Sequence, residues 1–60
     1  MFFEVGKNYV VYTTDDKSAS GELLEHNEFG VVILVQSEYS TGKPTFFSFN
    51  TISKIIKSSN

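Results

Sequence analysis

The residues best suited to chemistry in this chain form one short polar stretch, His26-Asn27-Glu28-Phe29-Gly30, between two apolar runs. Consecutive residues there carry an imidazole, an amide, a carboxylate and an aromatic ring. His26 is the only histidine, and so it is the only conventional base for a nucleophile–base–orienter set. The stretch is either a turn between strands, in which an asparagine side chain caps backbone groups, or the loop of a binding site.

The rest of the sequence offers few residues that could support catalysis or bind a metal. Asp15 and Asp16 are adjacent, but neighbours in a strand point to opposite faces, and in a turn both are solvated. The four glycines are scattered singly, so the chain has no glycine-rich phosphate loop. With no cysteine and one histidine, thiolate zinc sites and histidine-rich metal sites are excluded. We therefore predict that the protein is not an enzyme and has no metal, no cofactor and no small-molecule substrate.

The size of the chain allows one domain and points to self-association. A chain of 60 residues buries only about 60% of its unfolded surface, and natural domains of this size often need disulfides, a metal or oligomerisation. Disulfides and the usual thiolate or histidine-rich metal sites are excluded, so oligomerisation is the favoured support. The net charge of −2 and the absence of arginine argue against a strong sequence-independent grip on phosphate, although a local cationic patch remains open.

The ends and the apolar runs indicate no export or membrane insertion. The start, Met1-Phe2-Phe3-Glu4, lacks the basic residues and the long apolar stretch of a secretory signal. The longest apolar run, residues 31–35, is far shorter than the ~18 residues of a membrane span. We therefore expect a cytoplasmic protein that has no membrane partner.

The elements that must position these residues are short strands separated by turns. Gly21 predicts a sharp bend or a close backbone approach in the second strand, and Pro44 is expected to open the fourth. Ile52, Ile55 and Ile56 also fit a helical stripe, which leaves open a helical turn over residues 51–57. The predicted strands cover residues 9–14, 18–25, 31–35, 45–49 and 52–56, and the predicted turns cover 15–17, 36–43 and 50–51.

The third predicted strand, residues 31–35, is apolar on both faces, which predicts that both faces are covered. A barrel interior could cover one face, and a neighbouring subunit or the N-terminal segment the other. The predicted fold is all-β, a small five-stranded, strongly bent antiparallel sheet. The chain is expected to be a single domain, residues 1–60, with an N-terminal segment (1–7), a barrel (8–57) and a frayed tail (58–60).

The order of these elements, together with two degenerate motifs, resembles the Sm-like family of Sm, LSm and Hfq proteins, and the Hfq branch is closest. The first motif of that family is a glycine and a hydrophobic residue, then an acidic loop and a hydrophobic strand. Gly21, Leu23 and Phe29 match it, and Asn27 stands where the family usually has Asp. In the second motif Asn50 stands where Hfq has its His. The resemblance covers about residues 6–57.

The resemblance implies an Sm-like (SH3-like) barrel whose N-terminal helix is short or absent. It also implies a homo-oligomeric ring of five to seven subunits, closed by pairing the fourth strand of one copy with the fifth of the next. The loop after the second strand and the turn before the last strand would line a pore that binds single-stranded U-rich or A-rich RNA. The ring would then act as an RNA chaperone or scaffold.

The same resemblance assigns roles to individual residues. Phe29 would stack on a base, and Asn27 and Asn50 would read base edges, whereas Glu28 near a pore would repel phosphate. Lys54 would contribute to a cationic rim that the ring repeats. The predicted RNA-binding residues are Asn27, Glu28, Phe29, Asn50 and Lys54.

Two other functions remain open. The ring could be a protein-interaction or assembly module that has lost RNA binding. Glu28 favours this function, and so does the absence from the second motif of the Arg-Gly pair of Sm proteins and the Lys-His pair of Hfq. The chain could instead be a monomeric SH3-like barrel that binds a peptide through Tyr9, Tyr12 and Tyr39.

Overall fold

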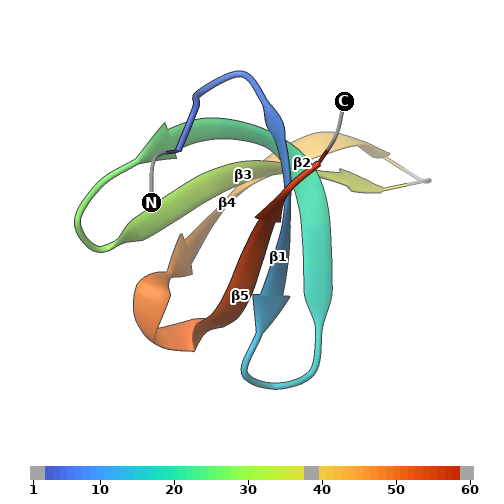
Figure 1. Ribbon diagram of the computed structural model, residues 1–60. Helices are drawn as coiled ribbons and strands as arrows, with labels where there is room; N and C mark the ends of the chain where they lie inside the picture. Colours follow the sequence, from blue (N-terminus) through green and yellow to red (C-terminus); the bar gives the residue numbers. More distant parts are fainter. Residues whose placement is uncertain (1–2, 38–39, 59–60) are drawn as a thin grey trace.

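The structure is a computed structural model that describes residues 3–37 and 40–58. These residues form an all-β fold, as predicted, with five strands and one short 3₁₀ turn (Figure 1). In chain order the elements are β1 (Asn8–Thr13), β2 (Ser18–His26), β3 (Gly30–Ser37), β4 (Ser40–Ser48), η1 (Phe49–Thr51) and β5 (Ile52–Lys57).

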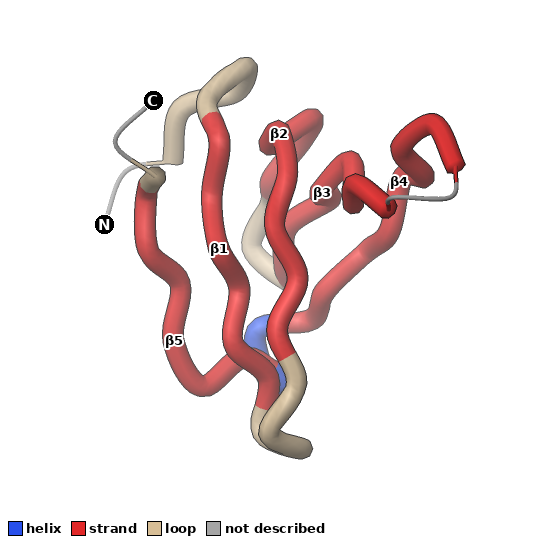
Figure 2. The backbone as a smooth tube through the Cα atoms, turned by 90° about the vertical axis from the view of Figure 1, so that its right-hand side faces the viewer, coloured by secondary structure: helices blue, strands red, loops and turns tan. Residues whose placement is uncertain are grey.

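The strands make one antiparallel sheet in the order β4-β3-β2-β1-β5. The sheet is strongly bent, so that β3 and β4 lie across from β1 and β5 and the two inner faces meet (Figure 2). β4 pairs only with β3, and β5 only with β1. Each of these two strands therefore has one edge that no other described strand bonds.

Two features of β2 produce its bend. The pairing of β2 with β3 shifts between Leu23 and Glu25, and such a bulge bends the strand and increases its twist. At Gly21 a Cβ atom would lie 1.9 Å from the carbonyl oxygen of Leu34, so only glycine allows β3 to approach so closely. The close backbone approach predicted at Gly21 is confirmed.

The core lies between the two halves of the bent sheet. Strand alternation sends Ala19, Gly21 and Leu23 to one face of β2, as the sequence predicts, and Val11 pairs with Ala19 on that face. Among the described residues, ten side chains fill this interior, five of them buried and five packed around those. The buried ones are Tyr9, Val11, Leu23, Val31 and Ile33, and the partly buried ones are Phe3, Val35, Phe47, Ile52 and Ile55.

The outer face of β3 differs from its inner face. Val32 and Leu34 point outward and are only half-buried, and their partners on β4 are Phe46 and Pro44. Phe46 is 51% exposed. The expectation of cover on both faces of this strand is therefore met on the inner face, while no described segment of the chain covers the outer one.

The N-terminal segment makes a turn at Val5 and Gly6 and is bonded to the end of the sheet. The backbone N–H of Gly6 donates to the carbonyl of Leu23 at 2.9 Å, and the N–H of Leu23 donates to the carbonyl of Lys7 at 2.9 Å. The N–H of Glu4 donates to the Tyr9 hydroxyl at 2.8 Å. At the other end of the chain, Ser58 N–H donates to the carbonyl of Asn8. In the part of the chain that the structure describes, no helix is long and apolar enough to cross a membrane.

Two local expectations were wrong. The turn predicted over residues 36–43 is mostly strand, since β3 continues to Ser37 and β4 begins at Ser40. Pro44 lies inside β4 rather than at its start, and its missing N–H is tolerated because β4 is an edge strand. The predicted strand over residues 52–56 is confirmed, since β5 spans Ile52–Lys57, and the helical turn that the sequence left open does not form there. The pairing of β1 with β5 shifts beside Ser53, and this bulge puts Ile52 and Ile55 on one face at a spacing that imitates a helix.

Candidate functional site

The loop between β2 and β3 is a turn built on the side chain of Asn27. Its Oδ1 atom accepts hydrogen bonds from the N–H of Phe29 at 2.7 Å and of Gly30 at 3.1 Å. The N–H of Asn27 donates to the carbonyl of Gly30 at 2.9 Å, which closes the loop. Asparagine commonly makes turns of this kind. The side-chain oxygen of Asn27 thus shapes the loop. The N–H groups of its side-chain amide remain as donors, because this side chain is exposed.

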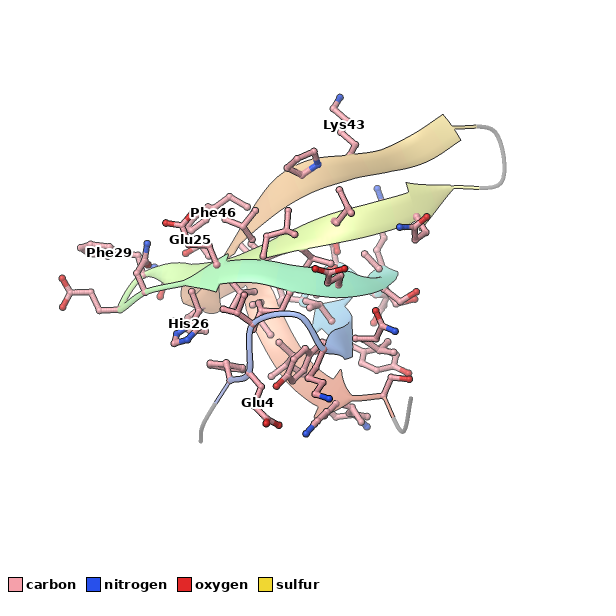
Figure 3. The ribbon with its side chains drawn as sticks, turned by 90° about the horizontal axis from the view of Figure 1, so that it is seen from above. Glu4, Glu25, His26, Phe29, Lys43 and Phe46 are labelled. Atoms are coloured by element: carbon pink, nitrogen blue, oxygen red, sulfur yellow. The ribbon has the colours of Figure 1, made fainter. Side chains whose placement is uncertain are left out.

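Phe29 points away from the core. Its side chain is 67% exposed, the highest value among the large apolar residues that the structure describes, and Figure 3 shows it at the far end of the β2–β3 hairpin. The chain directly after it is held tightly, because a Cβ at Gly30 would lie 2.1 Å from the carbonyl oxygen of Phe47. The ring of Phe29 therefore lies in solvent.

Asn50 lies in a second turn that touches this loop. The N–H of Phe49, at the start of η1, donates to the carbonyl of Phe29 at 2.9 Å. Within η1 the Ser48 hydroxyl accepts from the N–H of Asn50 at 3.3 Å, and the Thr51 hydroxyl donates to the carbonyl of Ser48 at 2.9 Å. The structure therefore brings the turns that carry Phe29 and Asn50 together, although they are far apart in sequence.

Lys54 does not belong to this pair of turns. Its Nζ atom lies 5.3 Å from the centroid of the Tyr12 ring, on the outer face shared by β5 and β1. A cation over an aromatic face is attracted by the ring quadrupole, so this contact holds the ammonium group against Tyr12. Glu28, by contrast, is exposed in the loop itself.

An aromatic cluster lies behind the two turns, and the sequence did not predict it. The Phe3 ring stacks on the Phe49 ring with 6.0 Å between centroids and 18° between planes. It also meets Tyr9 edge-on at 6.0 Å and His26 at 5.6 Å. No local pattern could have joined Phe3 to Phe49, because they lie near opposite ends of the chain. His26 here contacts an aromatic ring, which is a structural role.

The shifted pKa values lie away from the loop. A hydrogen bond from Lys57 lowers the pKa of Glu4, and the same bond raises the pKa of Lys57. A hydrogen bond from the Thr13 hydroxyl lowers the pKa of Asp15. All three groups are exposed. The first interaction joins the N-terminal segment to β5, and the second stabilises the turn between β1 and β2.

The structure does not assemble the three-tyrosine peptide site. Tyr9 is only 3% exposed and belongs to the core, whereas Tyr12 is 38% exposed on the outer face. The two side chains leave β1 on opposite faces, and Tyr39 lies outside the described residues. Nor does any group of three or more potential metal ligands come together within residues 3–37 and 40–58.

No protein-family model, curated protein or solved structure matches this chain. The geometry of the two turns and of the sheet is therefore the basis for assigning a function.

Proposed function

We propose that the chain forms an Sm-like barrel, that copies of it assemble into a homo-oligomeric ring, and that the ring binds single-stranded RNA as a chaperone or scaffold without catalysis. The observation that carries the proposal is the exposed ring of Phe29. The ring belongs to a loop whose conformation the Asn27 side chain stabilises. A backbone hydrogen bond joins Phe29 to the turn that carries Asn50.

The two open edges of the sheet support assembly. β4 and β5 each have an edge that no other described strand bonds, and exposed edges are usually paired or blocked in stable proteins. Phe46 near one edge is 51% exposed and Ile56 near the other is 43% exposed. Pairing β4 of one copy with β5 of the next would satisfy both edges and would cover part of the outer face of β3 and β4.

The exposed aromatic ring supports RNA as the ligand. A base stacked on such a ring contributes about 1–3 kcal/mol, and stacking accepts every base because each has a π-face. Asn27 and Asn50 are exposed on the two joined turns, and their amide groups can bond to base edges, as in recognition of unpaired bases. A ring of subunits repeats this arrangement, so weak contacts in each copy add along one strand.

One observation favours a second function, a ring that binds protein rather than RNA. Glu25 and Glu28 are both exposed near the loop, while Lys54 is held against Tyr12. Carboxylates at this position repel phosphate, and the oxygen of Asn27 is already occupied by the backbone. A basic or neutral protein segment would avoid this repulsion.

Fluorescence anisotropy of labelled U-rich and A-rich RNA oligomers, at about 50 and 200 mM salt, tests the proposal. We expect saturable binding that weakens only modestly with salt, because stacking and not charge carries it. Phe29→Ala should weaken binding by more than about tenfold, while the native mass stays that of the wild-type assembly. Phe29→Leu is the matched control, since it keeps apolar bulk and loses the π-face, and it should bind as poorly as Phe29→Ala.

Either of two results would contradict the RNA proposal. Absence of binding to both oligomers at high protein concentration would leave the protein-binding ring as the better function. Equal binding by the wild type and both Phe29 variants would mean that the loop is not the site. A monomeric native mass would overturn the ring itself.

A further inference from the structure

Four phenylalanine and tyrosine side chains are exposed in the described part of the chain, and they are Tyr12, Phe29, Phe46 and Phe49. The Tyr12 ring is taken by the ammonium group of Lys54, and Phe46 lies on the outer face of β4. Phe29 and Phe49 belong to the two joined turns of the candidate site. That site therefore presents two exposed rings, of which only Phe29 has a role in the proposed function.

The two rings belong to residues whose backbones are in direct contact. The N–H of Phe49 donates to the carbonyl of Phe29 at 2.9 Å. Backbones joined in this way lie about 5 Å apart, which is within the reach of two consecutive nucleotides of a single strand. Phe29 is 67% exposed and Phe49 is 37% exposed, so bases can approach both rings.

The Phe49 ring is held from behind before any ligand arrives. The Phe3 ring stacks on it with 6.0 Å between centroids and 18° between planes. Phe3 also contacts His26 and Tyr9, and Tyr9 is buried in the core, which anchors the stack. A ring that is already ordered loses little freedom on binding. The exposed part of Phe49 is therefore a surface on which a base can continue the stack.

Each exposed ring has an amide side chain close to it in the chain. Asn27 precedes Phe29 by two residues, and Asn50 directly follows Phe49. The Asn27 oxygen is bonded to the loop backbone, which leaves its side-chain N–H groups as donors. Within η1 the backbone N–H of Asn50 is bonded, and its side chain is exposed. Each turn thus combines a stacking surface with a group that can bond to a base edge.

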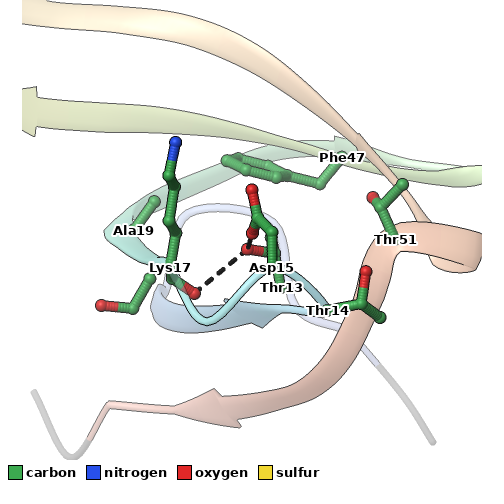
Figure 4. A pocket seen from close by; sticks show the side chains of 8 residues that line it. Thr13, Thr14, Asp15, Lys17, Ala19, Phe47 and Thr51 are labelled. Carbon is green, nitrogen blue, oxygen red and sulfur yellow. Dashed lines mark hydrogen bonds between the residues drawn. The ribbon is translucent and has the colours of Figure 1, made fainter.

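The rings lie outside the pocket between the turn after β1 and the inner face of β4. This pocket has a volume of about 440 Å³, and Ala19, Phe47 and Thr51 are among the residues that line it (Figure 4). Neither Phe29 nor Phe49 lines it. Small-molecule sites enclose most of their ligand, whereas a single strand is bound along an open surface by successive aromatic rings. The position of the two rings suits a single strand that crosses both turns.

We propose, on the basis of the RNA-binding function proposed above, that each copy binds two consecutive bases of one strand, one stacked on Phe29 and the other on Phe49. Asn27 and Asn50 bond to the edges of these two bases. The second stacked base strengthens binding without adding positive charge. This matters because Glu25 and Glu28 are exposed near the loop and repel phosphate.

Calorimetric titration of the full chain with poly(U) measures how many nucleotides each copy covers, and poly(A) replaces it if the A-rich oligomer binds better. We expect equivalence at two nucleotides per copy. The contribution of each base is then measured by fluorescence anisotropy with two labelled hexamers. One is the complete hexamer, and the other, the half-abasic hexamer, has the same backbone but lacks every second base.

The comparison of these hexamers between wild type and Phe49→Leu is the decisive arm. Loss of alternate bases should weaken binding to the wild type by about tenfold or more, because each copy then stacks one base instead of two. In Phe49→Leu the same loss should weaken binding by less than about twofold, because the second ring is already missing. A variant that only distorts the turns would weaken both hexamers alike and keep the tenfold difference.

Phe46→Leu is the matched control, since it makes the same substitution at an exposed ring on the outer face of β4. It should keep the tenfold difference between the hexamers. If Phe49→Leu fails to fold, Asn50→Ala takes its place, because the hydrogen bond of Asn50 within η1 uses its backbone. Asn50→Ala should weaken binding of the complete hexamer by about threefold or more. The half-abasic hexamer, which can still use Phe29, should bind it as it binds the wild type.

Two kinds of failure are distinguishable. Equivalence at one nucleotide per copy would overturn the inference, and so would a tenfold difference that persists in Phe49→Leu, or in Asn50→Ala where that variant replaces it. In either case the proposed function would stand if Phe29→Ala still weakened binding. Absence of binding to complete uridine and adenosine hexamers would overturn the proposed function, and this inference with it.

Discussion

The backbone N–H of Phe49 donates a hydrogen bond of 2.9 Å to the carbonyl oxygen of Phe29. This one bond joins the loop between β2 and β3 to the turn between β4 and β5. The Phe49 ring in turn stacks on Phe3, so the N-terminal segment supports the same junction. Residues from three parts of the chain therefore hold the position of the exposed Phe29 ring, and substitutions that disturb any of them should affect stability and ligand binding together.

Asn27 should contribute to stability through its side-chain oxygen. Asn27→Ala removes two hydrogen bonds to the loop backbone, and we expect a loss of about 1–2 kcal/mol in the free energy of unfolding. Asn27→Asp keeps the acceptor oxygen and should recover most of that loss. Urea unfolding followed by circular dichroism measures both variants. Equal destabilisation by alanine and aspartate would show that the oxygen does not hold the loop.

Gly30 should tolerate no side chain. A Cβ at this position would lie 2.1 Å from the carbonyl oxygen of Phe47 and 2.9 Å from the Phe46 ring, so β3 and β4 would have to separate. We expect Gly30→Ala to cost about 1–3 kcal/mol or to prevent folding. Gly6→Ala is the comparison, because a Cβ there meets open space and only the positive φ is unfavourable. Denaturation midpoints should rank Gly30→Ala well below Gly6→Ala.

Alternation and glycine placement made much of the fold predictable. Ala19, Gly21 and Leu23 could be assigned to one face of a strand from their spacing, and the close approach at Gly21 followed from its place in the middle of that strand. The spacing of Ile52 and Ile55 left a helical turn open beside the predicted strand, because the bulge near Ser53 that puts both on one face has no clear signature in sequence. The ends of β3 and β4 were missed because polar residues such as Gln36 and Thr41 resemble a turn even where strands pair.

The candidate site was predictable only in part. The loop could be recognised by its polar residues, but the directions in which its side chains point are set by tertiary contacts. Exposure of Phe29 depends on the close contact between Gly30 and β4, and the displacement of Lys54 from the loop depends on its pairing opposite Tyr12. The stack of Phe3 on Phe49 is a long-range contact, which no local pattern encodes.

The ion pair between Glu4 and Lys57 should make stability depend on pH. Lys57 holds the folded pKa of Glu4 below its ordinary 4.5, so the pair stabilises the fold above that value, and this contribution is lost as pH falls through the lowered pKa. The pKa of Lys57 is raised above its ordinary 10.5, so its contribution is complete below 10.5 and is lost as pH rises through the raised value. Both groups are exposed, and added salt should weaken the effect.

Unfolding of the wild type and of Glu4→Gln at about pH 3 and pH 6 isolates this pair. The wild type should be the more stable at the higher pH, and the two proteins should converge at the lower one. Asp15 titrates in the same acidic range with its pKa lowered by Thr13, but it is present in both proteins and cancels in their difference. A difference that stays constant with pH would rule out the ion pair as its cause.

Phe46 should separate assembly from folding. Its ring lies on the outer face of β4 opposite Val32, 51% exposed, so Phe46→Ser removes apolar surface that the proposed pairing of β4 with β5 would cover. We expect native mass spectrometry to show a shift from the assembly toward the monomer, because burial of such a side chain contributes about 1.5–3 kcal/mol at each contact. The circular dichroism spectrum should stay that of the folded chain, since Phe46 is not part of the buried core.

Phe29→Ser is the control, because it removes an equally large exposed ring from the loop and should leave the assembly whole. If both variants keep the wild-type mass, the outer face of β4 is not an interface between copies, and the open edges of the sheet must be satisfied in another way.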